Sequence, residues 1–293
     1  MSQSIVVIGS VNLDYTATAS RFPAKGETIL GQGFSTQPGG KGGNQAIAAS
    51  KLGGDVEFIG AIGRDAAGEA LKENFERFGV KLQGLDIVDD VHTGIAQIIV
   101  AERDNMIVVV SGANMEVTTD RVQAHLDLID QSDIVVVQLE IPLETVTYLV
   151  DYAYQQGKTI ITNPAPAQAL PKSVIDQSTY ITPNVIELKV IFGQARVEEI
   201  LASYPNKIVY TCGSKGAYFH DGDSLIHVAP EVVNVVDTTG AGDTFNGALA
   251  VALSEGQPLL EAVRFANRAA AMAITQTGAQ TAMPTRQELE GAF

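Results

Sequence analysis

Short runs of β-branched residues alternate with longer helical stretches along most of this chain. The runs cover residues 5–8, 56–62, 134–139, 159–162, 180–182 and 208–211. They are apolar without strict alternation, which is typical of strands buried on both faces. Stretches of helical character lie between most of them. The pattern therefore predicts an α/β fold with a mostly parallel, Rossmann-like central sheet sandwiched by helices.

Two stretches depart from this rhythm. Residues 15–38 and 91–110 carry polar and apolar residues in near alternation, most clearly at 28–35 and 93–101. Such segments, punctuated by Gly and Thr, are typical of antiparallel strands. They add no separate core, so we predict a single domain over residues 1–293 with a small β lid formed by about 15–38 and 91–110.

The last third of the chain favours helices. Phe245, Leu249 and Leu253 are spaced by four, and residues 262–273 are rich in alanine. Pro284 is expected to precede a last short helix. The Pro-rich residues 163–172 are expected to form a loop between two core units.

Charge and hydropathy exclude several classes of protein. The chain has 293 residues, of which 45% are hydrophobic, enough for a large core. Its 19 basic and 34 acidic residues give a net charge of −15, the wrong sign for a nucleic-acid partner. No apolar run approaches the roughly 18 residues of a membrane span, and the first ten residues lack the basic start and the small-residue cleavage site expected of a signal peptide. We expect a cytoplasmic protein, in which an anionic ligand would need local binding devices.

A glycine-rich string at residues 38–46 is the first candidate for such a device. Four of the five residues at 39–43 are glycine, so a ligand could approach the main chain and the following helix. It is not a Walker A loop, because Gly42 follows Lys41 where Ser or Thr is required. A flexible turn with a solvated lysine is the alternative interpretation.

The second candidate is Asp-Thr-Thr-Gly-Ala-Gly-Asp at residues 237–243, just before a helix. Glycines at a helix start direct free N–H groups toward one point, a cradle for phosphate or for developing negative charge. Asp243 is expected in the first helical turn. Alternatively, Asp243 only caps the helix.

Further polar residues follow the predicted strands. Asn12 and Asp14 come soon after the first strand, Glu140 ends the strand at 134–139, and Asn184 and Glu187 follow the one at 180–182. In doubly wound sheets, ligands bind at the carboxyl ends of strands, so we expect these residues to share one crevice. For Asn12 and Asp14 an Asx turn is the alternative.

Together, the segments at 39–44 and 237–243 resemble the two signatures of the ribokinase family of carbohydrate kinases. The likeness covers essentially the whole chain, and the second signature is highly specific. It implies the ribokinase-like fold and an ATP-dependent kinase that phosphorylates D-ribose at its 5-hydroxyl to ribose 5-phosphate. A related kinase for deoxyribose, another small sugar or a nucleoside, and a non-catalytic sugar or nucleotide sensor, remain alternatives.

The resemblance also implies roles for individual residues. Asp243 would accept the proton of the substrate hydroxyl, and Gly240, Ala241 and Gly242 would offer N–H groups to the transferred phosphoryl. The sugar is expected at Asn12, Asp14, Gly40, Lys41, Gly42, Asn44, Glu140 and Asp243. ATP is expected at Asn184, Thr211, Gly213, Ser214, Gly216, Gly242 and Asn267.

Cations and a second subunit are implied in the same way. Glu187 would be associated with Mg²⁺. A monovalent cation, K⁺, is expected at Asp237, Thr239, Ala273, Gln276, Gly278 and Ala282. Ala282 stands where the family often has a hydroxyl side chain, which weakens the expected K⁺ dependence. A homodimer through the lid is expected, because alternating strands leave an apolar face that needs cover.

Overall fold

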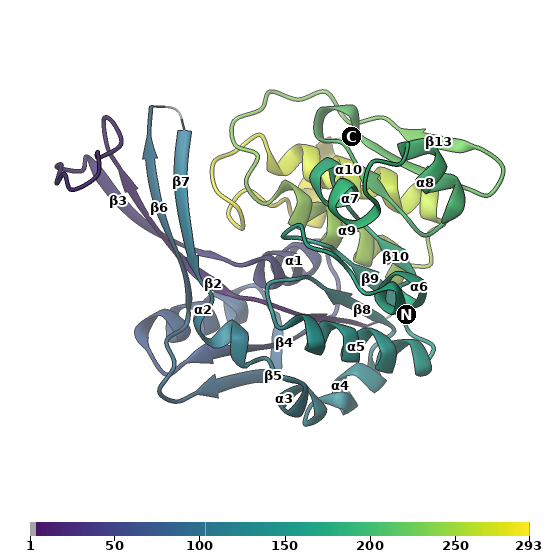
Figure 1. The fold of residues 1–293 in the computed structure, drawn as a ribbon, viewed down its shortest axis with the longest axis horizontal. Helices are drawn as coiled ribbons and strands as arrows, with labels where there is room; N and C mark the ends of the chain where they lie inside the picture. The colour runs from purple at the N-terminus through teal and green to yellow at the C-terminus, as the bar shows by residue number, and fades with distance from the viewer. Residues whose placement is uncertain (1–3, 103, 293) are drawn as a thin grey trace.

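A six-stranded, wholly parallel sheet forms the centre of the computed structural model, which describes residues 4–102 and 104–292 (Figure 1). In spatial order its strands are β10 (Tyr180–Ile181), β9 (Thr159–Thr162), β8 (Ile134–Val137), β1 (Ile5–Ile8), β4 (Val56–Gly63) and β5 (Lys81–Val88). The predicted ranges 1–293 and 91–110 include residues 1–3, 103 and 293, which lie outside this description. The predicted sheet is confirmed, although β5 was not foreseen.

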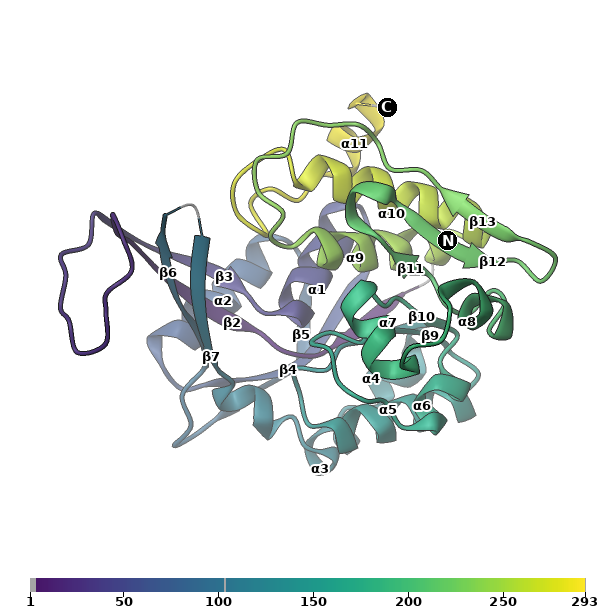
Figure 2. The same ribbon diagram turned by 45° about the horizontal axis from the view of Figure 1, so that its top comes forward.

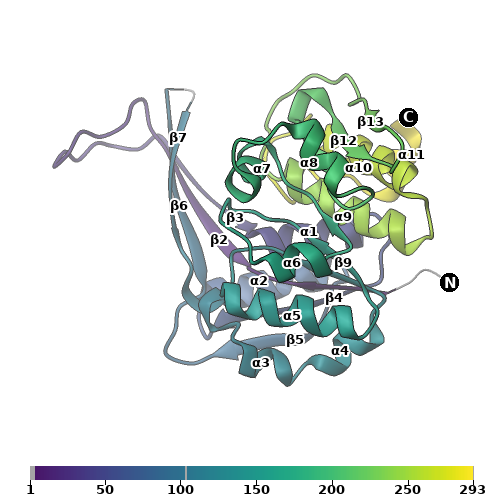
Figure 3. The ribbon, with the colours of Figure 1, turned by 45° about the vertical axis from the view of Figure 1, so that its right-hand side comes forward.

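Both faces of the sheet are covered by helices, as the apolar strands predict. Ile5 and Val7 belong to one hydrophobic core, and Val6 and Ile8 to the other. The first face carries α1 (Lys41–Lys51), α2 (Ala66–Arg77), α9 (Ala241–Ser254), α10 (Leu259–Ala273) and α11 (Arg286–Ala292). The second carries η1 (Gly112–Glu116), α3 (Thr119–Gln123), α4 (Leu126–Gln131), α5 (Leu143–Gln155) and α6 (Lys172–Gln177) (Figure 3).

A four-stranded sheet projects away from the body of the molecule (Figures 1 and 2). Its order is β3 (Gly33–Gly39), β2 (Asn12–Thr18), β6 (Gly94–Ala101) and β7 (Asp104–Val110). The outer pairs are antiparallel as expected, but β2 and β6 are parallel. The reason is that each follows a parallel strand of the central sheet. Residues 28–32 are not a strand, because β2 ends at Thr18, opposite Gly33, and the chain between them is a loop.

A third, antiparallel sheet lies beyond β10 and was not predicted. It consists of β11 (Tyr210–Thr211), β12 (Ala217–His220) and β13 (Leu225–Val228). Around it lie α7 (Val185–Phe192), α8 (Val197–Ser203) and η2 (Gly213–Lys215). The predicted strand at 208–211 runs alongside β10 in parallel, with bridges from Ile208 to Ile181 and from Thr211 to Asn184. It is not one of the six strands of the central sheet, because its last two residues form β11 and pair with β12.

The helices predicted near the C-terminus are present, whereas the helix at the glycine-rich string begins earlier than predicted. The predicted helices correspond to α9, α10 and α11. Helix α1 begins at Lys41, so Gly42 and Gly43 lie in its first turn rather than in a loop before it. Gly40 precedes the helix with φ +82°.

In the described part of the chain, no helix has the length and apolar character needed to cross a membrane.

Candidate active site

The loops that follow β1 and β8 meet the start of α1 at the carboxyl edge of the central sheet. The Ser10 hydroxyl donates a 2.5 Å hydrogen bond to Glu140 Oε2. The backbone N–H of Lys41 donates to the same oxygen at 3.0 Å. Three separate segments therefore converge on the carboxylate of Glu140.

Asp243 lies in the first turn of α9, where its side chain is buried. It does not cap that helix, since no side chain does and Gly240 takes the cap position in a left-handed conformation. Instead, Asn44 Nδ2 donates to Asp243 Oδ2 at 2.8 Å and Gln45 Nε2 donates to Oδ1 at 3.1 Å. The capping alternative is therefore wrong.

The pKa of Asp243 is raised above its ordinary value. Burial is the main cause, and Glu140 adds to it, while Lys41 and the hydrogen bonds from Asn44 and Gln45 oppose the rise. A carboxylate with a raised pKa is a better proton acceptor than a free aspartate. The site thus combines a fixed orientation of Asp243 with increased basicity.

Lys41 is partly buried among carboxylates and is not the solvated lysine of a flexible turn. Burial lowers its pKa, but Asp243, Glu140 and Glu187 outweigh that effect and raise it. The lysine is therefore held as a cation. It borders a hollow of about 230 Å³ with Asn163, Ala165, Thr182, Asn184, Glu187, Thr211, Thr238, Gly240, Ala241, Gly242, Asp243 and Asn246. The expected phosphoryl-side residues Gly240–Asp243 thus face the same space as Lys41.

Asn12 and Asp14 lie in β2, so the Asx-turn alternative is wrong for both. Asn12 Oδ1 accepts from Asn114 Nδ2 at 2.7 Å, which leaves the Asn12 amide nitrogen for a ligand. Burial and the neighbouring Glu140 raise the pKa of Asp14 to about 6.

A second hollow, of about 460 Å³, is bordered by Asn12 and Glu140 together with Val109, Ser111, Asn114, Met115, Leu139, Ile141, Pro142, Leu143, Pro166 and Gln168.

The residues expected to hold a nucleotide are only partly brought together. Asn184 and Thr211 border the smaller hollow, and Gly213 and Ser214 continue from Thr211 into exposed η2. Asn267 is buried on α10, where its amide donates to the carbonyls of residues 228 and 229. Gly216 has φ +79°, and a Cβ there would lie 2.2 Å from the Val228 carbonyl oxygen. Gly216 and Asn267 therefore shape the loops at β12 and β13.

Asn184 and Glu187 form a reciprocal cap at the start of α7. Asn184 Oδ1 accepts from the N–H of Glu187, and the N–H of Asn184 donates to Glu187 Oε2 at 2.8 Å. Burial raises the pKa of Glu187, although hydrogen bonding from Asn184 and the charge of Lys41 oppose it. Glu187 places one carboxylate beside the smaller hollow. This suits Mg²⁺, because that ion keeps several waters and is held largely by substrate phosphates.

The two loops expected around a monovalent cation lie against each other. Asp237 Oδ2 accepts from the N–H of Gly278 at 2.9 Å, and Asp237 Oδ1 accepts from the N–H and hydroxyl of Thr239. The pKa of Asp237 is lowered, because these hydrogen bonds outweigh its burial. Ala273 and Ala282 are buried and Gln276 is exposed. A carboxylate and backbone carbonyls suit a hard cation, with Ala282 able to offer only its carbonyl.

Several residues at the site were not singled out from the sequence. Asn163 Oδ1 accepts from Gln45 Nε2 at 3.0 Å, and Thr182 Oγ1 donates to Asn246 Oδ1 at 2.7 Å. Gln45 stands beside Asn44 in the glycine string, which was a usable signal. Asn163 and Thr182 directly follow β9 and β10, so the expectation that polar residues after strands line the site applied to them as well as to Glu140.

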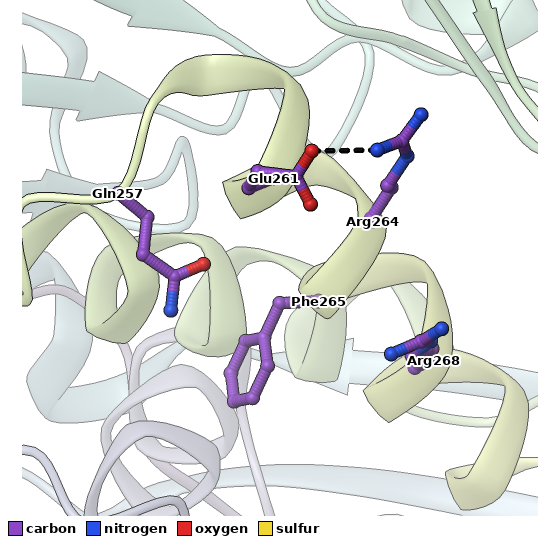
Figure 4. Close-up of a pocket in the computed structure, with 5 residues that line it drawn as sticks. All are labelled: Gln257, Glu261, Arg264, Phe265 and Arg268. Carbon is purple, nitrogen blue, oxygen red and sulfur yellow. Dashed lines mark hydrogen bonds and ion pairs between the residues drawn. The ribbon is translucent and has the colours of Figure 1, made fainter. Parts of the chain in front are cut away.

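A hollow elsewhere on the surface, along α10, lacks these features (Figure 4). It measures about 430 Å³ and is lined by Gln257, Glu261, Arg264, Phe265 and Arg268. Arg264 pairs with Glu261 at 2.5 Å, and Arg268 pairs with Glu231 at 3.1 Å. Because these guanidinium groups are matched by carboxylates of the chain, the hollow offers no excess charge for an anionic ligand.

Comparison with known proteins agrees with this geometry. The family model described as pfkB family carbohydrate kinase matches residues 2–286. The chain belongs to the pfkB family of carbohydrate kinases. It is 44% identical to the ribokinase of Bacillus subtilis over 288 residues, which cover 98% of each protein.

Two solved structures show the same fold. The ribokinase of Thermotoga maritima superposes with a TM-score of 0.91 at 35% identity, covering 99% of this chain and 98% of that one. The Arabidopsis thaliana ribokinase, solved with ribose and ATP, also gives 0.91, at 31% identity and the same coverage. The predicted fold class, family and enzyme class are thereby confirmed.

Proposed function

We propose that this kinase transfers the γ-phosphoryl group of ATP to the 5-hydroxyl of D-ribose, giving ribose 5-phosphate and ADP. One observation carries the proposal: buried Asp243, in the glycine-rich first turn of α9, borders the same hollow as Lys41 and interacts electrostatically with Glu140, which neighbours Asp14. The likeness to ribokinases along nearly the whole chain supports ribose as the acceptor.

In the proposed mechanism, Asp243 orients the sugar hydroxyl and accepts its proton late. Phosphoryl transfer is usually loose, so the hydroxyl becomes acidic only as its bond to phosphorus forms. The N–H groups of Gly240, Ala241 and Gly242 would bind the transferring oxygens. Apart from its chain neighbours and the backbone of its own helix, no atom lies within 4 Å of where a Cβ of Gly242 would stand, so this residue leaves open space beside the reacting group.

We propose Mg²⁺ and K⁺ as the cations of the reaction. Mg²⁺ would neutralise charge on the phosphates, and Glu187 would hold it through water. K⁺ would lie between the loops of Asp237 and Gly278, bound mainly by backbone carbonyls. Dependence on K⁺ is expected to be modest, since Ala282 contributes no side-chain oxygen.

Release of ADP with Mg-ATP is the test of substrate. Ribose, deoxyribose, fructose, adenosine and no sugar would each be assayed with Na⁺ or K⁺. Strong preference for ribose is expected. Preference for another acceptor would replace ribose but keep Asp243. Absence of turnover with every acceptor would favour the sensor alternative.

For a nucleoside, exposed Phe34 and Ile107 on the lid are the apolar surfaces that could receive a base.

Sugar affinity should weaken in acid. With its pKa at about 6, Asp14 is largely ionised at pH 7 and mostly protonated at pH 5, where it accepts hydrogen bonds from sugar hydroxyls less well. For one essential carboxylate, kcat/KM for ribose should fall about tenfold between pH 7 and pH 5. Initial rates at subsaturating ribose measure this. In Asp14→Asn the same decline should be much smaller; an unchanged pH profile in that variant would assign the titration to another group.

We also propose that the chain is one domain with a lid, forms a homodimer through that lid, and is cytoplasmic. All of β7 is exposed, including Met106, Ile107 and Val108, and Phe34 on β3 is 71% exposed. Apolar side chains exposed on a thin sheet are unfavourable in water, and contact with the lid of a second subunit would bury them. Light scattering at micromolar concentration would reject this assembly by giving a strictly monomeric mass.

A further inference from the structure

Both carboxylate oxygens of Asp243 are held by side-chain amides of neighbouring residues on α1. Asn44 occupies Oδ2 and Gln45 occupies Oδ1, at 2.8 and 3.1 Å. A carboxylate accepts about four hydrogen bonds, so positions remain for a substrate hydroxyl. The direction in which those positions point depends on how the two amides are fixed.

The amide of Asn44 is fixed by a residue more than 200 positions away. Gln280 Nε2 donates to Asn44 Oδ1 at 3.0 Å, and Asn74 Nδ2 donates to Gln280 Oε1 at 2.7 Å. Each amide accepts with its oxygen and donates with its nitrogen. The three amides therefore form a head-to-tail chain that ends at Asp243, an arrangement in which each hydrogen bond strengthens the next.

Gln280 has the properties of a buried connector. It is 4% exposed and does not line the hollow that contains Asp243. It lies in the segment between α10 and α11, whereas Asn44 and Asn74 lie on α1 and α2. Its backbone carbonyl accepts from Lys51 Nζ at 3.3 Å, which anchors the main chain independently of the side chain.

We propose that Gln280 is a positioning residue for Asp243, acting through Asn44. Its N–H group occupies Asn44 Oδ1 and thereby requires Asn44 to present Nδ2 to the carboxylate. Without that donor, the Asn44 amide can rotate, and its oxygen would repel Asp243. The inference rests on the proposed role of Asp243 as proton acceptor.

One substitution of Gln280, made in two backgrounds, separates positioning from packing. Gln280→Met keeps the size of the side chain but removes its donor and acceptor. In the wild-type background it frees the Asn44 amide that binds the Asp243 carboxylate, whereas in the Asp243→Asn background that carboxylate is absent. The matched control is Gln177→Met on α6, where the glutamine binds Asp151 away from the site.

The measurement is kcat at saturating ribose and Mg-ATP at neutral pH, with thermal unfolding of each variant. Gln280→Met should lower kcat about tenfold, the scale of one weakened hydrogen bond to a charged group, with KM for ATP unchanged. In the Asp243→Asn background, Gln280→Met should cost little further activity, because no carboxylate remains for Asn44 to orient and the two changes then share one effect.

Two results would overturn the inference. One is a wild-type kcat in Gln280→Met; the other is a loss that only follows the unfolded fraction and is equally large in the Asp243→Asn background. Gln177→Met should keep the wild-type rate. No turnover by the wild type itself would instead contradict the proposed function, so the two failures are distinguishable.

Discussion

Asp243→Asn is expected to lower kcat by at least about 10²-fold, the scale for a positioned acid or base. The amide cannot accept the hydroxyl proton. It also places an NH₂ group against one of the two donors, Asn44 or Gln45, that now bind the carboxylate. Steady-state turnover with ribose and Mg-ATP gives the rate, and calorimetric titration should show that both substrates still bind.

Asp176→Asn is the matched control for this change. Asp176 is an exposed carboxylate on α6, paired with Lys172, and its substitution should leave turnover at the wild-type level. Turnover near the wild-type rate in Asp243→Asn would exclude Asp243 as the proton acceptor. It would leave the fold and the family unaffected.

Gly40→Ala is expected to reduce the free energy of unfolding by about 3 kcal/mol, combining backbone strain with overpacking. Gly40 has φ +82°, which L side chains rarely adopt. A Cβ there would lie 2.7 Å from the backbone nitrogen of Asn12 and 2.7 Å from Val11 Cα. Main-chain atoms cannot move aside as a flexible side chain can. Urea denaturation monitored by circular dichroism measures the loss.

Gly53→Ala separates the two causes. Gly53 has φ +92°, but nothing lies within 4 Å of its Cβ position, so only the strain remains. Its expected cost is about 1 kcal/mol. Equal losses at both positions would show that the close approach of Gly40 to the first strand's loop is unimportant. A larger loss at Gly40, together with a higher KM for ribose, is expected because Asn12 would be displaced.

The fold could be predicted in class but not in all its connections. Apolar strands buried on both faces follow from the one-dimensional pattern, and β1 and β9 have the predicted bounds. The segment 208–211 lies parallel to β10 as expected, but its pairing with β12 in an antiparallel sheet was missed, because a short apolar run looks the same in both kinds of sheet. The parallel pairing of β2 with β6 was missed because it depends on where the chain enters the lid.

Some residues of the candidate site could likewise be predicted from the sequence, and others could not. The local signatures identified Asp243, Lys41 and Gly40–Gly42, since a glycine string before a helix has a physical meaning that can be read from neighbouring residues. Glutamine at position 280 belongs to no local motif. Its hydrogen bond to Asn44 spans 236 residues, so only the packed structure reveals it.

The sequence by itself determined the alternation of strands and helices, the family signatures and the residue types available for chemistry. These are properties of near neighbours along the chain, where backbone sterics and hydrophobic periodicity act. Tertiary structure alone decided which side chains face Asp243, which pKa values shift and which way each amide points. Those properties depend on burial and hydrogen bonding between distant segments, and the burial of Asp243 beside Lys41, Asn44 and Gln45 is their combined result.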